Sequence, residues 1–312
     1  MVLQGRAIVV TGGAGFIGSH LVDRLLEDPA VNVVVIDNFS RGKAANLAHL
    51  RGEARLRIIE ADIRDRSALI EAFADASLVY HLAAQSTVMG AFRDPAYTFD
   101  TNVVGTFNVL RAAQQCNLER VLFASSREVY GEPIALPVDE DSPLSAINSY
   151  GASKVAGEVY CRAFRREFGL QTVILRLANV YGPRDQGRVV PQWLQQVASG
   201  QELQMYGGKQ VIDFVWVGHV VDALVRAGAL DGPLPPINIG SGTGTRIVDL
   251  ARRIGRLTES QPKIRFVSAR PMDVTRFIAN VDRMRQILMV EPPLDPLGNL
   301  VDLVAAPVAA WG

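Results

Sequence analysis

The chain has 312 residues, of which 48% are hydrophobic and 21% are charged. This length exceeds one average domain, so one large α/β unit with a smaller appendage fits best. The formal net charge is zero and the isoelectric point is near 6.9. This balance argues against nucleic acid or a membrane surface as a partner. No apolar run approaches the roughly 20 residues that a membrane-spanning helix needs.

The two cysteines, Cys116 and Cys161, lie in long helical patterns without the spacing of a metal or redox site. We expect both to be buried small side chains in a reducing compartment, and we expect no bound metal. Met1 to Arg6 is too short for a signal peptide. We therefore expect a cytoplasmic protein.

The first predicted elements flank a glycine-rich turn. Ala7 to Val10 predicts a β-strand and Ser19 to Glu27 predicts a helix, with Gly12, Gly15 and Gly18 between them. Glycine is needed in such a turn because the backbone must turn tightly, approach a pyrophosphate and let the helix sit close to the strand. The free amides and the dipole of the helix start would hold the negative phosphates.

The second predicted strand, Val33 to Ile36, ends at Asp37, which lies 19 residues after Gly18. A carboxylate at this place can accept hydrogen bonds from an adenosine ribose. It would also repel a 2′-phosphate, which favours NAD over NADP. Arg41 and Lys43 lie nearby and moderate that preference.

Short β-branched runs alternate with helical patterns up to about residue 180. This alternation predicts a parallel, doubly wound (Rossmann) sheet of the α/β class, covered by helices on both faces. The further expected strands are 58–59, 78–81, 121–124 and 173–176, and the further expected helices are 66–75, 96–115 and 149–168.

Beyond Tyr181 the pattern breaks into short pieces at prolines and glycines, which predicts a smaller C-terminal α+β substrate-binding lobe. We expect residues 1–180 to form the NAD-binding domain, with contributions from about 211–240, and residues 181–312 to form mainly the substrate lobe. Ligands should bind in the crevice at the carboxyl ends of the central strands.

Tyr150 and Lys154 are four residues apart in a predicted helix, so they share one face. A tyrosine with its ordinary pKa near 10 is a poor base at neutral pH. A cation beside it, together with a positive nicotinamide ring, would favour the phenolate. Ser126 ends a predicted strand at the mouth of the crevice, where its hydroxyl could bond the substrate oxygen and share a proton with Tyr150.

With these motifs the chain resembles the extended short-chain dehydrogenase/reductase family, in its branch of nucleotide-sugar epimerases and dehydratases. The resemblance extends to about residue 290. The matching segments are 11–18, 37–38, 62–63, 81–85, 102–106, 125–131, 150–154, 176–183 and 270–274.

The resemblance implies a catalytic trio of Ser126, Tyr150 and Lys154. It implies that NAD contacts Tyr150 and Lys154 as well as Gly12, Gly15, Phe16, Ile17, Gly18, Asp37, Asn38, Asp62, Ile63, Leu82, Ala83, Ala84 and Asn102. It implies that a nucleotide sugar, which we expect to be UDP-linked, contacts Glu128, Asn179, Gln204, Tyr206, Arg270 and Asp273. Among these, Asn179 and Arg270 would hold phosphates, and 204–206 would border the base.

In the family, NAD takes a hydride from C4 of the sugar while the tyrosine takes the hydroxyl proton. The transient 4-keto sugar then rotates and is reduced on its other face, or loses water, or loses carbon dioxide from a uronic acid. We expect a 4-epimerase of a UDP-hexose. A homodimer is also implied, through the helices near 96–115 and 149–168.

Two positions bear on the choice of reaction. Dehydratases of this family carry an Asp-Glu pair where this chain has Arg127 and Glu128, which counts against dehydration. A uronate decarboxylase commonly keeps the glutamate, and Arg127 or Arg276 could attract its carboxylate, so that alternative stays open. Two further alternatives are another 4-keto-forming nucleotide-sugar dehydratase or reductase and an NAD-binding regulatory protein without catalysis. Epimerases usually carry a diphosphate-binding arginine where this chain has Ile212, so another cation must serve or the ligand differs. The candidate cations are Arg184, Arg188 and Lys209.

Overall fold

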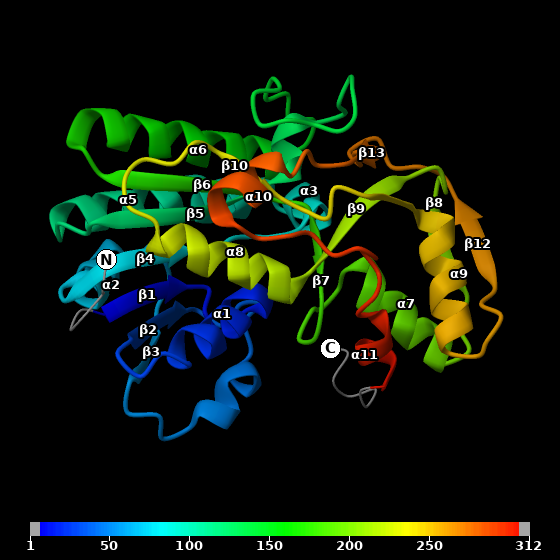
Figure 1. Cartoon of the computed structure of the whole chain (residues 1–312), viewed down its shortest axis with the longest axis horizontal. Coiled ribbons are helices and arrows are strands. Elements are labelled where there is room, and N and C mark those ends of the chain that lie inside the picture. Colours follow the sequence, from blue (N-terminus) through cyan, green and yellow to red (C-terminus); the bar gives the residue numbers. More distant parts are fainter. Residues whose placement is uncertain (1–6, 306–312) are drawn as a thin grey trace.

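The computed structural model describes residues 7–305, and its larger part is built on a seven-stranded parallel sheet (Figure 1). The order of the strands is β10-β6-β5-β4-β1-β2-β3, and every neighbouring pair is parallel. This confirms the predicted doubly wound sheet. The strands are β1 Ala7–Thr11, β2 Asn32–Asp37, β3 Leu56–Glu60, β4 Ala76–His81, β5 Arg120–Ser126, β6 Gln171–Leu177 and β10 Ile237–Ile239.

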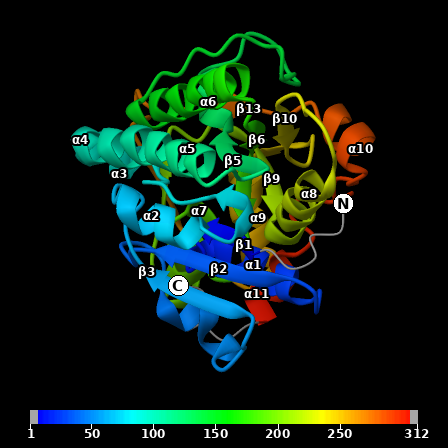
Figure 2. The same cartoon turned by 90° about the vertical axis from the view of Figure 1, so that its left-hand side faces the viewer.

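Helices cover both faces of this sheet (Figure 2). Alternate residues of a strand point to opposite faces, so Ile8 and Val10 enter one core and Val9 enters the other. The first core is covered by α1 Phe16–Leu26, α8 Val217–Ala229 and α10 Asp282–Leu288. The second is covered by α2 Arg66–Phe73, α5 Gly105–Gln115 and α6 Ser149–Phe168.

The helix predicted over 96–115 is divided into three consecutive parts. A short helix, α4 Pro95–Phe99, runs into a π-helical turn, η2 Asp100–Val104, and then into α5. The π turn holds Asn102 inside the protein, where it is almost fully buried. Hydrophobic spacing alone does not distinguish a π turn from an α-helix, so the sequence predicted one helix.

Two smaller expectations need correction. The first helix begins at Phe16 rather than Ser19, because the glycine turn leads directly into it with Gly15 as the residue before the first turn. Cys161 is buried as expected, but Cys116 is only partly buried because it lies at the end of α5.

The smaller part of the molecule is an α+β lobe (Figure 1, right). Its core contains Trp193, Leu250 and Leu300. Its four-stranded sheet holds β7 Asn179–Tyr181, β9 Val211–Trp216, β11 Gly244–Arg246 and β13 Arg276–Phe277, and β8 Leu203–Tyr206 pairs with β12 Ile264–Val267. Its helices are α7 Val189–Ala198, α9 Ile247–Leu257 and α11 Leu300–Ala305.

Residues 211–240 are shared between the two parts. β9 belongs to the small sheet, α8 packs against α1, and β10 extends the large sheet beside β6. The remaining short elements are η1 Ala44–Leu50, α3 Val88–Arg93 and η3 Arg127–Tyr130. Among residues 7–305, no helix has both the length and the apolar character to cross a bilayer. The expectation about Met1 to Arg6 falls outside the described residues.

Candidate active site

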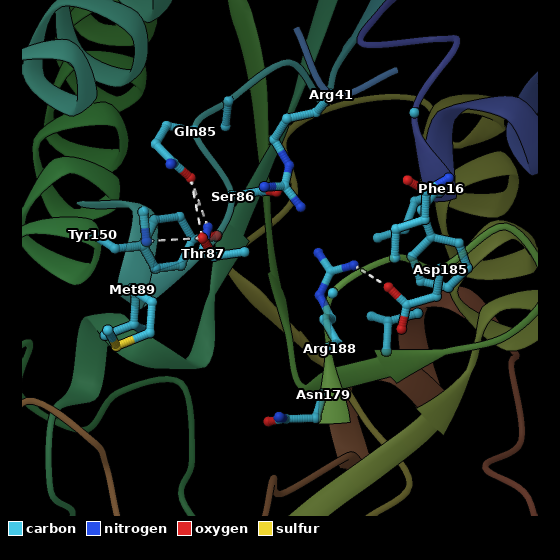
Figure 3. Close-up of a pocket in the computed structure, with 18 of the residues that line it drawn as sticks. Phe16, Arg41, Gln85, Ser86, Thr87, Met89, Tyr150, Asn179, Asp185 and Arg188 are labelled. Carbon is cyan, nitrogen blue, oxygen red and sulfur yellow. Dashed lines mark hydrogen bonds and ion pairs between the residues drawn. The ribbon is translucent and has the colours of Figure 1, made fainter. Parts of the chain in front are cut away.

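A cavity of about 1490 Å³ lies between the carboxyl ends of the large sheet's strands and the smaller lobe. The glycine turn and the ends of β2, β4 and β5 form one wall, and β7, β8 and α7 contribute to the other. Figure 3 shows side chains from both parts pointing into it. This is the place where a doubly wound sheet is expected to bind its ligands.

The glycine turn brings backbone to the cavity wall at positions where no side chain fits. Gly12 has φ +73°, and a Cβ there would lie 2.8 Å from the amide nitrogen of Ala83. A Cβ on Gly18 would overlap the carbonyl oxygen of Gly12. Both glycines are therefore required by close packing, Gly12 against the loop after β4 and Gly18 against the turn's own backbone. The predicted residues Gly12, Gly15, Phe16, Ile17, Gly18, Leu82, Ala83 and Ala84 all line the cavity.

Asp37 ends β2 at the rim of the cavity, where backbone amides hold its carboxylate. Its Oδ2 accepts from Ala14 N and its Oδ1 from Phe39 N, both at 2.9 Å. Burial raises the pKa of this carboxyl group, and these two hydrogen bonds oppose the rise. Asn38 and Ile63 also line the cavity.

Two predicted cofactor residues lie behind the cavity wall instead of in it. Asp62 accepts from Asn38 Nδ2 at 2.7 Å and pairs with Arg64, whose hydrogen bond lowers the pKa of Asp62 to about 2. Asn102 Oδ1 accepts from Gln85 N at 2.7 Å, and its Nδ2 donates to Ser153 Oγ at 2.9 Å. Asn102 therefore ties the loop after β4 to α6.

Ser126, Tyr150 and Lys154 converge on the cavity from β5 and α6. The helix begins at this point because Asn148 caps it, accepting from Gly151 N at 2.8 Å. Lys154 lies one turn later and is almost fully buried, with its Nζ donating to the carbonyl oxygen of Ala124 at 2.8 Å. Its Nζ is 6.0 Å from the centre of the Tyr150 ring.

The electrostatics of this group differ from the expectation. In the protein alone, burial raises the pKa of Tyr150, whereas the nearby Arg188 and the hydrogen bond with Ser126 lower it. Arg188 and Arg127 are cations that favour the ionised form of the phenol. Burial also lowers the pKa of Lys154 to about 8, because the charged amine is desolvated.

Arg127 and Glu128 form an ion pair in the cavity wall directly after Ser126, with Nη2 and Oε1 2.9 Å apart. The other carboxylate oxygen of Glu128 accepts from Asn148 Nδ2 at 2.8 Å. Both side chains are largely buried. The pair therefore places a cation and an anion next to Ser126, Tyr150 and Lys154.

The other predicted substrate residues all line the opposite wall. Asn179 begins β7, and its buried Oδ1 has no hydrogen-bond partner. Arg270 donates to Asp273 Oδ2 at 2.7 Å and lies over the Tyr206 ring, with Cζ 4.3 Å from its centre. Gln204 lies beside Tyr206 on β8. A nucleotide extending across the cavity would meet an amide, an aromatic ring and a guanidinium here.

Three cations were expected to replace the diphosphate-binding arginine that is absent at Ile212, and they differ in whether they line the cavity and are already paired. Ile212 forms an apolar part of the wall. Arg184 and Arg188 line the cavity, but Arg184 is held by Asp23 at 2.8 Å. Lys209 is not in the lining. Arg276, a candidate for a carboxylate, is likewise outside it and lies 3.9 Å from Glu132.

The loop after β4 contributes residues that the sequence analysis did not assign to the site. Gln85, Ser86 and Thr87 of this loop and Met89 of the following helix α3 lie close to Tyr150 in the cavity (Figure 3). Their position directly after a buried strand was the available signal. Asp185 also lines the cavity, and no sequence pattern had pointed to it.

Among the described residues, no cluster of three His, Cys, Asp or Glu side chains could hold a metal ion.

Comparison with known proteins places these features in context. The model of the NAD dependent epimerase/dehydratase family matches residues 8–240. A UDP-glucose 4-epimerase of Mycolicibacterium smegmatis is 36% identical, covering 91% of this chain and 93% of the relative. UDP-glucuronic acid decarboxylase 6 of Arabidopsis thaliana is 33% identical, with 91% and 84% covered. The structure of a UDP-N-acetylglucosamine 4-epimerase from Methanobrevibacter ruminantium superposes with a TM-score of 0.90 at 31% identity, covering 97% of this chain and 98% of the other.

Proposed function

The chain belongs to the NAD dependent epimerase/dehydratase family, and on this premise we propose that it is a nucleotide-sugar 4-epimerase that acts on a UDP-hexose. One observation carries the proposal. Ser126, Tyr150 and Lys154 meet in the same cavity as a glycine turn that admits no side chains. A phenol, a hydroxyl and an amine of this kind suit the removal and return of a hydroxyl proton.

The cavity suits NAD as the cofactor. Gly12, Gly15 and Gly18 line the cavity at the start of α1, where a pyrophosphate would meet backbone, and Asp37 lines it where an adenosine ribose would need an acceptor. When bound, NAD would supply reversible hydride transfer at C4 of the sugar. Asn102 would act as a positioning residue through the loop after β4, and Asp62 would do so through Asn38.

The protein's own groups would handle the proton. Tyr150 would accept the proton of the C4 hydroxyl, and Ser126 Oγ would hold the same oxygen by a hydrogen bond. With a pKa of about 8, Lys154 stays largely protonated at pH 7 and opposes the cost of a phenolate next to it. After the 4-keto sugar has rotated to present its other face, return of the hydride to C4 and of the proton to the C4 oxygen would complete an epimerisation with no net redox change.

The wall of the smaller lobe would bind the nucleotide part of the substrate. The free Oδ1 of Asn179 lacks a donor, and a ligand hydroxyl would satisfy it. Arg270 would meet a phosphate, while Gln204 and Tyr206 would border the base. Glu128 and Asp273 would orient Arg127 and Arg270 toward the ligand.

A UDP-glucuronate decarboxylase is the second candidate, and the Arg127–Glu128 pair favours it specifically. The pair lines the cavity beside Tyr150, where a C6 carboxylate would meet a guanidinium. Glu128 would then remain close to the sugar. The missing acid at position 127 continues to argue against dehydration.

The outer face of α5 and α6 supports the further proposal of a homodimer. Phe107, Val159, Tyr160 and Phe168 are exposed on this face. The Phe107 and Tyr160 rings lie 5.3 Å apart. Apolar side chains gathered on two neighbouring helices suit a helical interface with a second copy. Light scattering behind a sizing column would show a dimer, and replacing Phe107 and Val159 by Asp should yield monomers.

Proton NMR of the purified protein with NAD tests the reaction. The substrates to mix with it are UDP-glucose, UDP-N-acetylglucosamine, UDP-glucuronate and dTDP-glucose. A new C4 epimer without net NADH would establish epimerisation and identify the sugar. A pentose product would assign decarboxylation instead, and a 6-deoxy-4-keto product would overturn both proposals.

A further inference from the structure

Asn148 precedes the helix that carries Tyr150, and its side chain joins three separate segments of the chain. Its Oδ1 accepts from Gly151 N at 2.8 Å, which caps the first turn of α6. Its Nδ2 donates to Glu128 Oε2 at 2.8 Å and to the carbonyl oxygen of Met272 at 3.1 Å. The amide group therefore uses both of its N–H donors and one of its acceptor positions.

Capping alone does not call for asparagine at this position. Serine, threonine and aspartate cap helices about as well. A serine hydroxyl has a single hydrogen to donate, and an aspartate carboxylate has none and would face the carboxylate of Glu128. Only an asparagine side chain combines the capping acceptor with two donors. The residue type at Asn148 therefore indicates a role beyond the cap.

Met272 belongs to the loop between β12 and β13 in the smaller lobe. The same loop carries Arg270 and Asp273, which line the cavity and form an ion pair at 2.7 Å. A second contact attaches this loop to the segment after η3, where the carboxylate of Glu132 accepts from Thr275 N and from Thr275 Oγ1, both at 2.6 Å. The loop that presents a guanidinium to the ligand is thus held against the large part of the molecule at two points.

Glu128 connects Asn148 with the groups beside the expected reaction. Its backbone N–H donates to Ser126 Oγ at 3.2 Å, and its Oε1 pairs with Arg127 Nη2 at 2.9 Å in the cavity wall. Rotation of the Glu128 side chain would move the guanidinium of Arg127 with it. Asn148 lies outside the cavity lining and holds this carboxylate in one orientation through Oε2.

We propose that Asn148 is a positioning residue that couples the Arg270 loop to Glu128 and to the start of the Tyr150 helix. One amide group holds all three segments, so displacement of the loop must break a hydrogen bond or move the other two segments as well. A nucleotide diphosphate bound at Arg270 would fix the loop and thereby hold Glu128 and Tyr150 in place. The inference rests on the proposed function, which supplies the ligand and the reaction.

Two variants separate the cap from the other two hydrogen bonds. Asn148→Ser and Asn148→Asp both keep a good cap, so both should fold, which thermal melting checks. Neither can donate to Glu128 and Met272 together. We expect kcat with the substrate found by NMR to fall about 10- to 100-fold, because small misplacements of reacting groups have effects of this size. In calorimetric titration of the NAD-saturated protein, the Kd for UDP should rise about 3- to 10-fold.

Asp65→Ala is the matched control. Asp65 caps α2 by accepting from Ser67 N and Ala68 N, and it lies outside the cavity lining. Its loss should lower the melting temperature but leave kcat and the Kd for UDP at their parental values. A general loss of stability is thereby distinguished from a loss of positioning. If kcat and the Kd for UDP of both Asn148 variants matched the parent, the proposal would be overturned.

A double-variant cycle tests whether Asn148 acts through Glu128. Asn148→Asp combined with Glu128→Gln reverses their hydrogen bond, because the new amide can donate to the new carboxylate. In the Glu128→Gln background, Asn148→Asp should therefore lower kcat by less than about threefold. UDP binding should remain weak there, because the carbonyl oxygen of Met272 still loses its donor. An equal loss of kcat in both backgrounds would exclude action through Glu128 and overturn the proposal.

Amide hydrogen exchange of the free protein tests the hydrogen bonds without any reaction. Asn148→Ser should speed exchange of the backbone amides of 270–275, whereas Asp65→Ala should not. Exchange at the parental rate in Asn148→Ser would show that the loop is held without this residue, against the proposal. Faster exchange in a protein that converts none of the sugar nucleotides would support the coupling and reject the proposed function instead.

Discussion

Two groups of polar and charged side chains differ in how completely their polar atoms are paired. One group lies around Glu158 on α6 and Arg176 on β6, both almost fully buried. The other lines the cavity and includes Arg41, Asn179 and Asp185. In the first group other protein atoms supply the hydrogen-bond partners, whereas in the second group several polar atoms have no hydrogen-bond or ion-pair partner.

The buried network is satisfied from several elements at once. Glu158 Oε1 accepts from Ser125 Oγ at 2.6 Å and from Arg176 Nε at 2.8 Å, while its Oε2 accepts from Arg176 Nη2 at 2.7 Å. Arg176 Nη1 donates further to Tyr130 Oη at 2.9 Å and to the carbonyl oxygen of Glu140 at 2.8 Å. Such a network fixes the positions of β5, β6 and α6 relative to one another.

In the cavity, Asn179 Oδ1 and Asp185 Oδ2 are buried without partners. Buried polar atoms are nearly always hydrogen-bonded in a working protein, so an unpaired one in a cavity wall points to a ligand or water. The comparison teaches that burial of charge alone does not identify a functional site. Incomplete pairing next to an open volume is the better indicator.

The largest expected effect is a loss of catalytic rate, caused by a substitution at Tyr150 in the cavity. Replacing Tyr150 by Phe removes the proton acceptor, so we expect kcat for epimerisation to fall about 10²- to 10⁴-fold, while NAD binding is retained. Tyr160→Phe on the outer face of the same helix is the control and should leave kcat unchanged. Steady-state kinetics with the substrate found by NMR measure both. Turnover within a few-fold of the parent would remove Tyr150 from the mechanism.

The next effect tests the buried network through stability. Glu158→Ala leaves the Arg176 charge buried without its partner, so we expect the free energy of unfolding in urea to fall by about 3–5 kcal/mol. A double variant with Met at positions 158 and 176 should recover much of that loss, because no lone charge remains. A fall below about 1 kcal/mol for Glu158→Ala would show that the network is not the structural element described above.

His81 provides a test by pH. Its two ring nitrogens lie 2.8 Å from Thr11 Oγ1 and 2.9 Å from Thr106 Oγ1, and burial lowers its pKa to about 3. Unfolding restores the ordinary value near 6.5, so below that pH the unfolded state binds more protons and stability falls as pH decreases. Between pH 6.5 and 4.5 the loss from this group is about 2–3 kcal/mol.

The measurement compares urea unfolding of the parent with His81→Gln at both pH values. The variant should lose less stability on acidification by that amount, because all other titrating groups are shared. Equal pH dependence in the two proteins would mean that His81 is not held neutral by the fold.

Local patterns made the sheet and part of the site predictable. The glycine turn, Asp37 and the Tyr150–Lys154 spacing each depend on residues that are close in sequence or share one helical face. The contact of Asn148 with Met272 was not predictable, because it joins residues 124 positions apart in sequence across the two lobes. The two- and three-residue strands β7, β11 and β13 are too short to show a period. The π turn at Asn102 depends on tertiary contacts with Gln85 and Ser153.

The smallest expected effect is on stability, from an exposed ion pair that is neither buried nor next to the cavity. Arg57 on β3 lies 3.1 Å from Glu71 on α2, and both side chains are more than half exposed. Water already solvates each charge, so Arg57→Ala should change the free energy of unfolding by less than about 0.5 kcal/mol. The remaining effect should shrink further in 0.5 M salt, because screening reaches exposed pairs and spares the buried Glu158–Arg176 pair. If Arg57→Ala cost as much stability as Glu158→Ala, an ion pair would stabilise this fold equally whether buried or exposed, and burial would not explain the strength of the Glu158–Arg176 pair.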